Sequence, residues 1–382
     1  MKKTAFVWML VPALALMLLA GCGTDTPDPS LPPVSESVGM ISSAPSAEPT
    51  DIPDAPTSAT TPGATPTPAP DNFTMKVTEA PAVANPLTGL AAQRTDARPV
   101  AVMINNIKKA LPQHGLKDAD ILYEIPAEGG ISRLLAIYND VSKVGVIGSV
   151  RSSRPIFIDV AASYDAVYIH HGGSPEAYEM LNAGKVYHLD GIYLEGSVFY
   201  RDAARRKTMG YEHSSMTTGA KITAKLLKSQ VRMTANAPAP AFRFSYNDIV
   251  PAGNAAESFT VRTGNYEASY DFLPEYGTYM RTQHGWSSDA NGTGKLDFRN
   301  VFVLQMKYSV ISGDAKGRLK FENIGSGKGY YITNGKMQEI TWKWSAANAR
   351  MKYYAADGSE LSVNAGKSMI HFVSSLGNVK VK

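Results

Sequence analysis

The first half of the chain alternates short apolar runs with stretches of helical periodicity. Strands are predicted where β-branched and aromatic residues cluster or alternate, at 99–104, 121–125, 134–138, 144–149 and 166–169. Helices are predicted at 156–162, 175–182 and 218–231. This alternation predicts an α/β region with a mixed sheet.

After residue 240 the pattern changes to short alternating runs between Gly, Asn and Asp turns, such as "FTVRT" and "YEASYDF". Such runs are typical of antiparallel strands in a sandwich, a barrel or a strongly curved sheet. The stretch "NAPAP" at 236–240 indicates a boundary. We therefore expect a mixed α+β protein, with the α/β region at 85–238 and an antiparallel β-rich region at 239–382.

The chain begins with two lysines and an apolar run that ends in Leu19-Ala20-Gly21-Cys22. The run is short for a membrane-spanning helix and predicts a signal peptide over residues 1–22. Its end resembles a bacterial lipobox, and the chain has no other cysteine. We expect cleavage before Cys22 and acyl chains such as palmitate on that residue, which anchor the protein to the outer face of the cell membrane. The alternative is an ordinary signal peptide with a chance cysteine.

Residues 23–84 hold 13 of the 24 prolines and a single aromatic residue, Phe73. Such a segment buries too little apolar surface to offset its chain entropy, so we predict a disordered Pro/Ser/Thr-rich tether. The chain carries +4, the signal segment +2 and the tether −7, which leaves +9 on residues 85–382. A basic body near an envelope surface favours anionic lipids or wall polymers, although a generic soluble surface can carry the same charge.

Polar residues follow several predicted strands of the α/β region. Ligands of open α/β sheets bind beyond the carboxyl ends of parallel strands, so these residues converge on one cleft if the strands are parallel neighbours. The residues predicted to bind a ligand are Asn105, Asn106, Arg151, Ser152, Arg154, His170, His171, Gly172, Gly173 and Ser174.

Arg151 and Arg154 are interpreted most directly as ligands of an anion, because the planar guanidinium group can donate two hydrogen bonds to a carboxylate or a phosphate. The alternative is a structural ion pair with Glu124, Glu128 or Asp159.

The stretch "HHGGSP" leads from a predicted strand into a predicted helix with Ser174 as its N-cap. Free backbone N–H groups at such a start can hold an anion. On the strand His170 and His171 face opposite sides, so we expect one in the core and one at the site. Gly172 and Gly173 have an architectural alternative, since glycine permits a turn with positive φ.

A catalytic interpretation rests on titratable residues near the same strand ends. Two carboxylates are the usual acid/base groups of glycoside hydrolysis, and a carboxylate with a histidine is another possible acid/base pair for a hydrolase or transferase. Solvated or ion-paired carboxylates are the alternative. The catalytic candidates are Glu124, Glu128, His171 and His213.

Several strong motifs are absent from the sequence. There is no His-Glu-x-x-His and no cysteine cluster, so we predict no metal site and no cofactor. "GSGKGYY" at 325–331 lies between predicted strands and indicates a glycine-rich hairpin rather than a phosphate loop. No basic-aromatic pattern supports nucleic-acid binding.

Eight stretches resemble the YerB-type bacterial lipoproteins: "NPLTGL" (85–90), "RPVAVMINN" (98–106), "LPQHGLKDADILYE" (111–124), "EGGISRLLAIY" (128–138), "VGVIGSVRSSRP" (144–155), "HHGGSPEA" (170–177), "NVFVLQM" (300–306) and "GSGKGYYITNGK" (325–336). That family has two consecutive domains of unknown function and occurs in Gram-positive bacteria. The resemblance implies a lipoprotein of two sequence regions, and it supplies no reaction.

Two functions follow as hypotheses. The first is a lipoprotein that binds an anionic envelope ligand, such as a wall polymer or an anionic small molecule, or that acts as an envelope accessory factor. The second is a hydrolase or transferase that acts on cell-wall glycan or peptide. The first is favoured, because no nucleophile or metal signature is present.

Overall fold

The computed structural model describes residues 73–236, 239–292 and 294–382. The signal segment, Cys22 and the tether as far as residue 72 lie outside the described residues. The helices are α1 (Pro155–Ser163), α2 (Pro175–Asn182), α3 (Gly191–Leu194), α4 (Ala203–Thr208) and α5 (Gly219–Lys228), with 3-10 turns η1 (Lys108–Ala110), η2 (Val141–Lys143), η3 (Tyr211–His213) and η4 (Leu376–Asn378).

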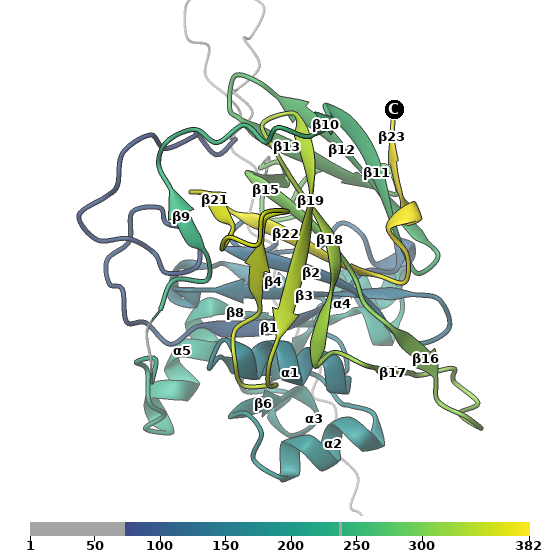
Figure 1. Cartoon of the computed structure of the whole chain (residues 1–382). Helices are drawn as coiled ribbons and strands as arrows, with labels where there is room; N and C mark the ends of the chain where they lie inside the picture. The colour runs from purple at the N-terminus through teal and green to yellow at the C-terminus, as the bar shows by residue number, and fades with distance from the viewer. Residues whose placement is uncertain (1–72, 237–238, 293) are drawn as a thin grey trace, which may run out of the picture. The chain divides into compact units, whose positions relative to one another are not determined.

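A large mixed sheet runs through both sequence regions (Figure 1). β20 (Lys352–Tyr354) joins this sheet off its main path by pairing with β19. The order along the path is β10 (Asn254–Ala255), β19 (Lys336–Trp344), β18 (Gly325–Thr333), β15 (Asn300–Gln305), β22 (Ser368–Val373), β2 (Ile121–Pro126), β3 (Ser132–Tyr138), β1 (Val100–Asn105), β5 (Val167–His170) and β6 (His188–Asp190).

Smaller sheets complete the fold. Five strands form an antiparallel sheet in the order β14 (Asp297–Phe298), β13 (Thr278–Gln283), β12 (Tyr266–Leu273), β11 (Ser258–Thr263) and β23 (Val379–Val381). The others are β4 (Val146–Gly148) with β8 (Ser215–Thr218) and β7 (Tyr200–Arg201), β16 (Tyr308–Val310) with β17 (Leu319–Phe321), and β21 (Ser362–Asn364) with β9 (Arg243–Ser245).

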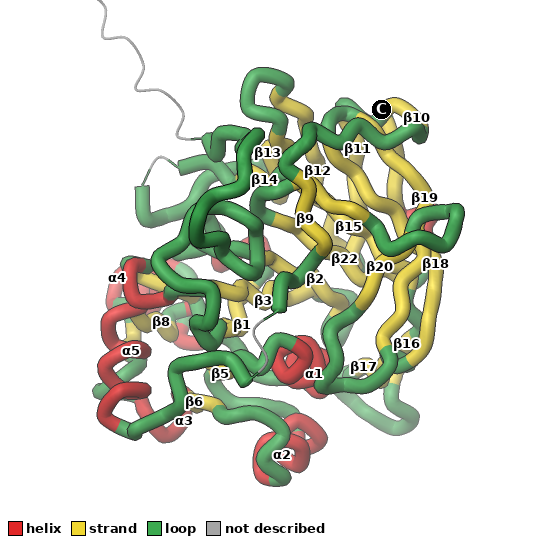
Figure 2. The backbone as a smooth tube through the Cα atoms, turned by 60° about the vertical axis from the view of Figure 1, so that its left-hand side comes forward, coloured by secondary structure: helices red, strands yellow, loops and turns green. Residues whose placement is uncertain are grey.

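The mixed α+β class predicted from the sequence is confirmed. Figure 2 shows the helices gathered at one end of the molecule and the strands over the rest. Strand pairing in the β-rich region is mostly antiparallel, but β15 and β22 run parallel. β22 is also parallel to β2, so the boundary predicted at residue 238 divides the sequence without dividing the sheet.

Both faces of the central strands are covered, which explains why every residue of β1 is buried. Successive side chains of a strand point to opposite faces. Met103 on one face belongs to the same apolar cluster as Phe157 of α1. Val102 on the other face belongs to a second cluster with Ile222 of α5 and Phe259 of β11.

The last part of the predicted tether contacts the folded body. The Phe73 ring lies 4.8 Å from the Tyr276 ring, centroid to centroid. The Thr74 N–H donates to Asp297 Oδ2 at 2.8 Å. The sequence assigned these residues to the tether because their surroundings are rich in Pro and small residues, yet the one aromatic side chain of that stretch finds a ring to pack on.

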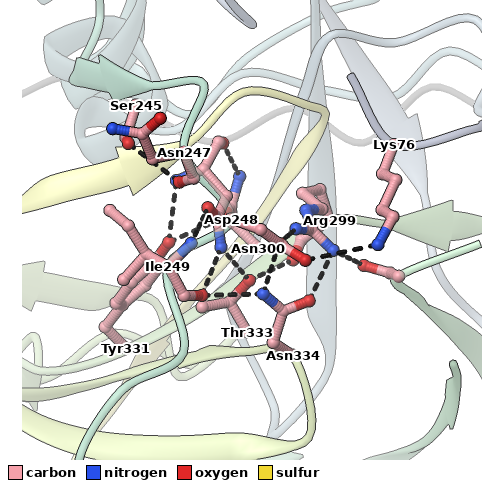
Figure 3. Close-up of polar contacts among 12 residues, drawn as sticks. Lys76, Ser245, Asn247, Asp248, Ile249, Arg299, Asn300, Tyr331, Thr333 and Asn334 are labelled. Carbon is pink, nitrogen blue, oxygen red and sulfur yellow. Dashed lines mark hydrogen bonds and ion pairs between the residues drawn. The ribbon is translucent and has the colours of Figure 1, made fainter. Parts of the chain in front are cut away.

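A polar cluster fixes the segment that leads into the β-rich region (Figure 3). Asp248 accepts from Asn334 Nδ2 at 2.6 Å, from Lys76 Nζ at 3.3 Å and from the Arg299 guanidinium. The Ile249 N–H donates to Asn364 Oδ1, another member of this cluster, at 2.8 Å. The cluster therefore ties the first described residues and the connecting segment to β15 and the β18–β19 turn.

Candidate functional site

The carboxyl ends of β1, β2 and β5 lie at one edge of the large sheet. β5 is parallel to β1, and β3 is antiparallel to both β1 and β2. β3 therefore begins at this edge, where Arg133 faces Asn105 of β1 in register. The condition of parallel neighbours holds for β1 and β5, whereas antiparallel β3 separates β1 from β2 and β4 belongs to another sheet.

Three arginines at this edge form the arginine cluster: Arg133, Arg151 and Arg154. Arg154 donates to Glu128 twice, from Nε at 2.8 Å and from Nη2 at 2.6 Å. Arg133 also pairs with Glu128, and its Nη1 donates to the Ser152 carbonyl at 2.6 Å. Burial and the neighbouring Arg154 lower the pKa of Arg133 to about 9. One carboxylate thus compensates two guanidinium groups, and the structural ion pair with Glu128 is real.

Arg151 makes a more accessible pair. Its Nη1 donates to the Glu212 carbonyl at 2.7 Å, and its Nη2 lies 3.2 Å from Glu212 Oε2. The Glu212 side chain is 66% exposed and that of Arg151 is 16% exposed. Exposed pairs of this kind contribute about 0–1 kcal/mol. An incoming anion can therefore displace the Glu212 carboxylate at little cost.

The His-His-Gly-Gly turn already holds an anion of the protein itself. Asp190 Oδ1 accepts from the Gly172 N–H at 2.8 Å and from the Ile192 N–H at 2.9 Å. Asp190 Oδ2 accepts from the Tyr178 hydroxyl at 2.7 Å. Ser174 caps α2 by accepting from the Ala177 N–H. The Gly172 N–H is thus not free for a ligand, and the turn is architectural.

His170 is the buried member of the pair, as the strand alternation predicted. Its Nδ1 donates to the Gly172 carbonyl at 2.8 Å, and its Nε2 lies 2.9 Å from His188 Nδ1. Because Nδ1 carries the proton, Nε2 accepts from His188. Burial lowers the pKa of His170 to about 4, so the ring is neutral at physiological pH.

His171 lies between Arg201 and Ser215 and hydrogen-bonds to both. Arg201 Nη2 donates to its Nε2 at 2.9 Å, so Nδ1 carries the proton and donates to Ser215 Oγ at 2.7 Å. Arg201 also donates from Nε to Glu195 Oε2 at 2.9 Å and lies 4.0 Å from the centre of the Tyr211 ring. Sequence reasoning missed Arg201, because nothing local marks it as a neighbour of His171.

In the described part of the chain, neither Glu124 nor Glu128 bonds to His171 or His213, although His371 Nδ1 lies 3.7 Å from Glu124 Oε2. Among the described residues, Glu128 bonds to arginines, and Glu124 bonds to Arg281, two amides and a hydroxyl. His213 Nδ1 instead accepts from Asn105 Nδ2 at 2.9 Å. The two candidate histidines lie beside other carboxylates: His213 Nε2 is 3.3 Å from Glu212 Oε1, and His171 Nε2 is 3.8 Å from Glu195 Oε2. The carboxylate–histidine pairs at this edge are therefore not the ones that the hydrolase hypothesis named.

Exposure separates the predicted ligand-binding residues into two groups. Five are buried and serve the protein's own hydrogen bonds or packing: Asn105, Asn106, His170, Gly172 and Ser174. Five are partly exposed and can meet a ligand: Arg151, Ser152, Arg154, His171 and Gly173.

Arg133 is a cluster member that the site prediction omitted. It lies at the start of a strand that is otherwise apolar, "SRLLAIY". A charged residue in such a run is the signal that could have found it, because buried arginines need partners. In the described part of the chain, no set of three or more His, Cys, Asp or Glu side chains is placed to hold a metal ion.

Comparisons with known proteins place the chain in a family. A model described as "Protein of unknown function (DUF3048) N-terminal domain" matches residues 87–232, and the corresponding C-terminal domain matches 258–370. The chain is 32% identical to "Putative lipoprotein YerB" of Bacillus subtilis (strain 168) over 302 residues, 76% of this chain and 86% of the relative. It belongs to the YerB lipoprotein family.

The solved YerB protein from Bacillus subtilis shares the fold. Its crystal structure matches with a TM-score of 0.70 at 28% identity, covering 78% of this chain and 99% of that chain. The family resemblance expected from the eight sequence stretches is thus confirmed. The name of the Bacillus subtilis relative describes that protein as a putative lipoprotein. Within residues 73–382, the described helices are too short or too polar to cross a membrane.

Proposed function

We propose that this protein is carried on the outer face of the cell membrane by lipid on Cys22 and binds an anionic cell-envelope ligand at the arginine cluster. The ligand class is a phosphate- or carboxylate-bearing wall polymer or a small molecule with the same groups. The lipobox sequence and the lipoprotein family support the anchor.

One observation carries the binding proposal. In the arginine cluster, Arg133 and Arg154 share the mostly buried carboxylate of Glu128, Arg151 pairs with the exposed Glu212, and the pKa of Arg133 is lowered to about 9. A lowered pKa means that the local environment destabilises the positive charge. A bound anion relieves that destabilisation, and Arg151 is the arginine whose present partner is most exposed.

The arginine cluster predicts a measurable stabilisation by anions. Inorganic pyrophosphate at about a hundred times its dissociation constant should raise the free energy of unfolding by roughly 2.7 kcal/mol relative to chloride at equal ionic strength. Arg151→Gln should weaken binding by roughly tenfold, since hydrogen bonds to charged groups contribute about 1.5–3 kcal/mol. Thermal unfolding of the purified chain measures both effects.

Two further variants make the test specific. Glu212→Gln removes the competing carboxylate and should tighten pyrophosphate binding. Arg262→Gln is the matched control, because Arg262 is a half-exposed arginine on β11 with a weak pair to Glu267 at 4.0 Å. If Arg151→Gln and Arg262→Gln lower the stabilisation equally, the ligand does not use the arginine cluster.

A further inference from the structure

A hollow of about 350 Å³ lies in the β-rich region, away from the arginine cluster. It is bordered by the segment before β9, by β20 and by the chain near residue 361. Its walls are largely apolar and include Phe242, Met351, Tyr353 and Leu361. Phe242, Met351, Tyr353 and Leu361 are themselves buried, so the apolar walls are part of the core rather than flexible surface.

Arg350 is one of the residues that line this hollow. Its guanidinium carbon lies 4.5 Å from the centre of the Tyr164 ring. Its Nη1 is buried and has no hydrogen-bond partner in the described part of the chain. Burial lowers the pKa of Arg350, and three neighbouring tyrosines oppose that shift. A cation–π contact is thus the principal compensation for a charge taken out of water.

The nearby carboxylates do not neutralise Arg350. Asp165 is paired with Arg98 at 3.6 Å and with Arg232 at 2.7 Å. Glu360 borders the hollow but is exposed, and the ion pairs of the described residues do not join it to Arg350. Buried guanidinium groups are normally paired, so this one is poised for an anion.

We propose that this hollow binds a small molecule that carries one carboxylate on an apolar ring or a short acyl chain. The carboxylate pairs with Arg350, and the apolar part packs against Phe242, Met351 and Leu361. Exposed Arg243 and Lys352 at the rim favour the approach of an anion. This binding site is independent of the arginine cluster.

Titration calorimetry of the full chain with 4-phenylbutyrate tests the proposal. The acid should bind with a dissociation constant below 1 mM, and the uncharged 4-phenylbutan-1-ol should bind at least tenfold more weakly. Arg350→Met should weaken acid binding at least tenfold, whereas Arg94→Met, which removes a half-exposed arginine elsewhere, should leave it unchanged. Glu360→Gln should tighten binding severalfold, because it removes the negative charge at the rim.

The unfolding midpoint of each variant separates binding from folding. Arg350→Met should unfold at the same temperature as the parent chain or above it, since it removes an unpaired buried charge. No binding of 4-phenylbutyrate at 10 mM overturns the proposal, as does equal binding of the acid and the alcohol. A lower unfolding midpoint for Arg350→Met, with acid binding unchanged, would assign Arg350 a structural role instead.

Discussion

Arg281→Met is expected to lower the free energy of unfolding by about 3–5 kcal/mol, the usual cost of leaving one member of a buried ion pair alone. Arg281 Nη2 donates to Glu124 Oε2 at 2.7 Å, and both side chains are almost fully buried. Burial alone raises the pKa of Glu124, but Arg281 and hydrogen bonds hold it below the usual value. Without Arg281, the Glu124 carboxylate is still buried away from water but has lost the positive charge that stabilises it. Urea denaturation at pH 7.5 measures the change.

The same network joins the two sequence regions. Glu124 lies on β2, and Arg281 and Gln283 lie on β13 of the smaller sheet. Gln283 Nε2 and Ser132 Oγ both donate to Glu124 Oε1, at 3.1 and 2.8 Å. Loss of the ion pair therefore weakens the contact between the sheets rather than one strand alone.

A second substitution and a control variant test whether the unpaired charge of Glu124 causes the loss of stability in Arg281→Met. Glu124→Gln in the Arg281→Met background removes the stranded charge, and it should restore at least half of the lost stability. Arg262→Met, on β11 of the same sheet but half exposed, should change stability by less than about 0.5 kcal/mol. A loss for Arg281→Met no larger than for Arg262→Met would show that the ion pair does not hold the sheets together.

Acidification from pH 6.5 to 4 should lower the free energy of unfolding by about 3–4 kcal/mol. Burial lowers the pKa values of His170 and His371 to about 4, against about 6.5 in the unfolded chain. Below pH 6.5 the unfolded state binds protons that the native state excludes, so each histidine removes about 3 kcal/mol across this window. Asp120 acts in the opposite direction, because burial raises its pKa to about 6 and the native state then binds the proton first. The loss of stability from the two histidines is larger than the gain from Asp120, so the free energy of unfolding falls.

Two variants separate these contributions. Asp120→Asn removes the opposing carboxyl and should make the acid loss steeper. His371→Gln keeps a side chain that can bond to Thr263 and Tyr270 but cannot titrate, so the acid loss should be smaller. Urea denaturation at pH 7.5, 6.0 and 4.5 gives the dependence of the free energy of unfolding on pH for the parent chain and for each of the two variants. Stability that rises or stays level on acidification would contradict the assignment of neutral buried histidines.

The local elements were predictable because each has a local cause. Ser174 and Pro175 mark the start of α2, which runs over Pro175–Asn182 as the sequence predicted. The β-branched runs placed β1, β2 and β5 to within a residue or two. The meeting of polar residues at one sheet edge followed from the shared direction of β1, β2 and β5, of which only β1 and β5 are neighbours.

The contacts that decide the site were not predictable, because they join distant parts of the chain. Glu124 and Arg281 are separated by 157 positions, and no local pattern couples them. Asp190, on a neighbouring strand, accepts a hydrogen bond from the Gly172 N–H. The turn that the sequence suggested as an anion site therefore already binds a carboxylate of the protein. The parallel pairing of β22 with both β2 and β15 likewise depends on tertiary packing.

Co-sedimentation with purified cell-wall material tests the central proposal most directly. Walls that retain their phosphate-bearing polymer should carry the protein down, and walls stripped of that polymer should release most of it. Arg151→Gln should sediment much less with intact walls, whereas Arg262→Gln should behave as the parent chain does. Equal sedimentation of all three proteins with intact and stripped walls would contradict an anionic envelope ligand at the arginine cluster.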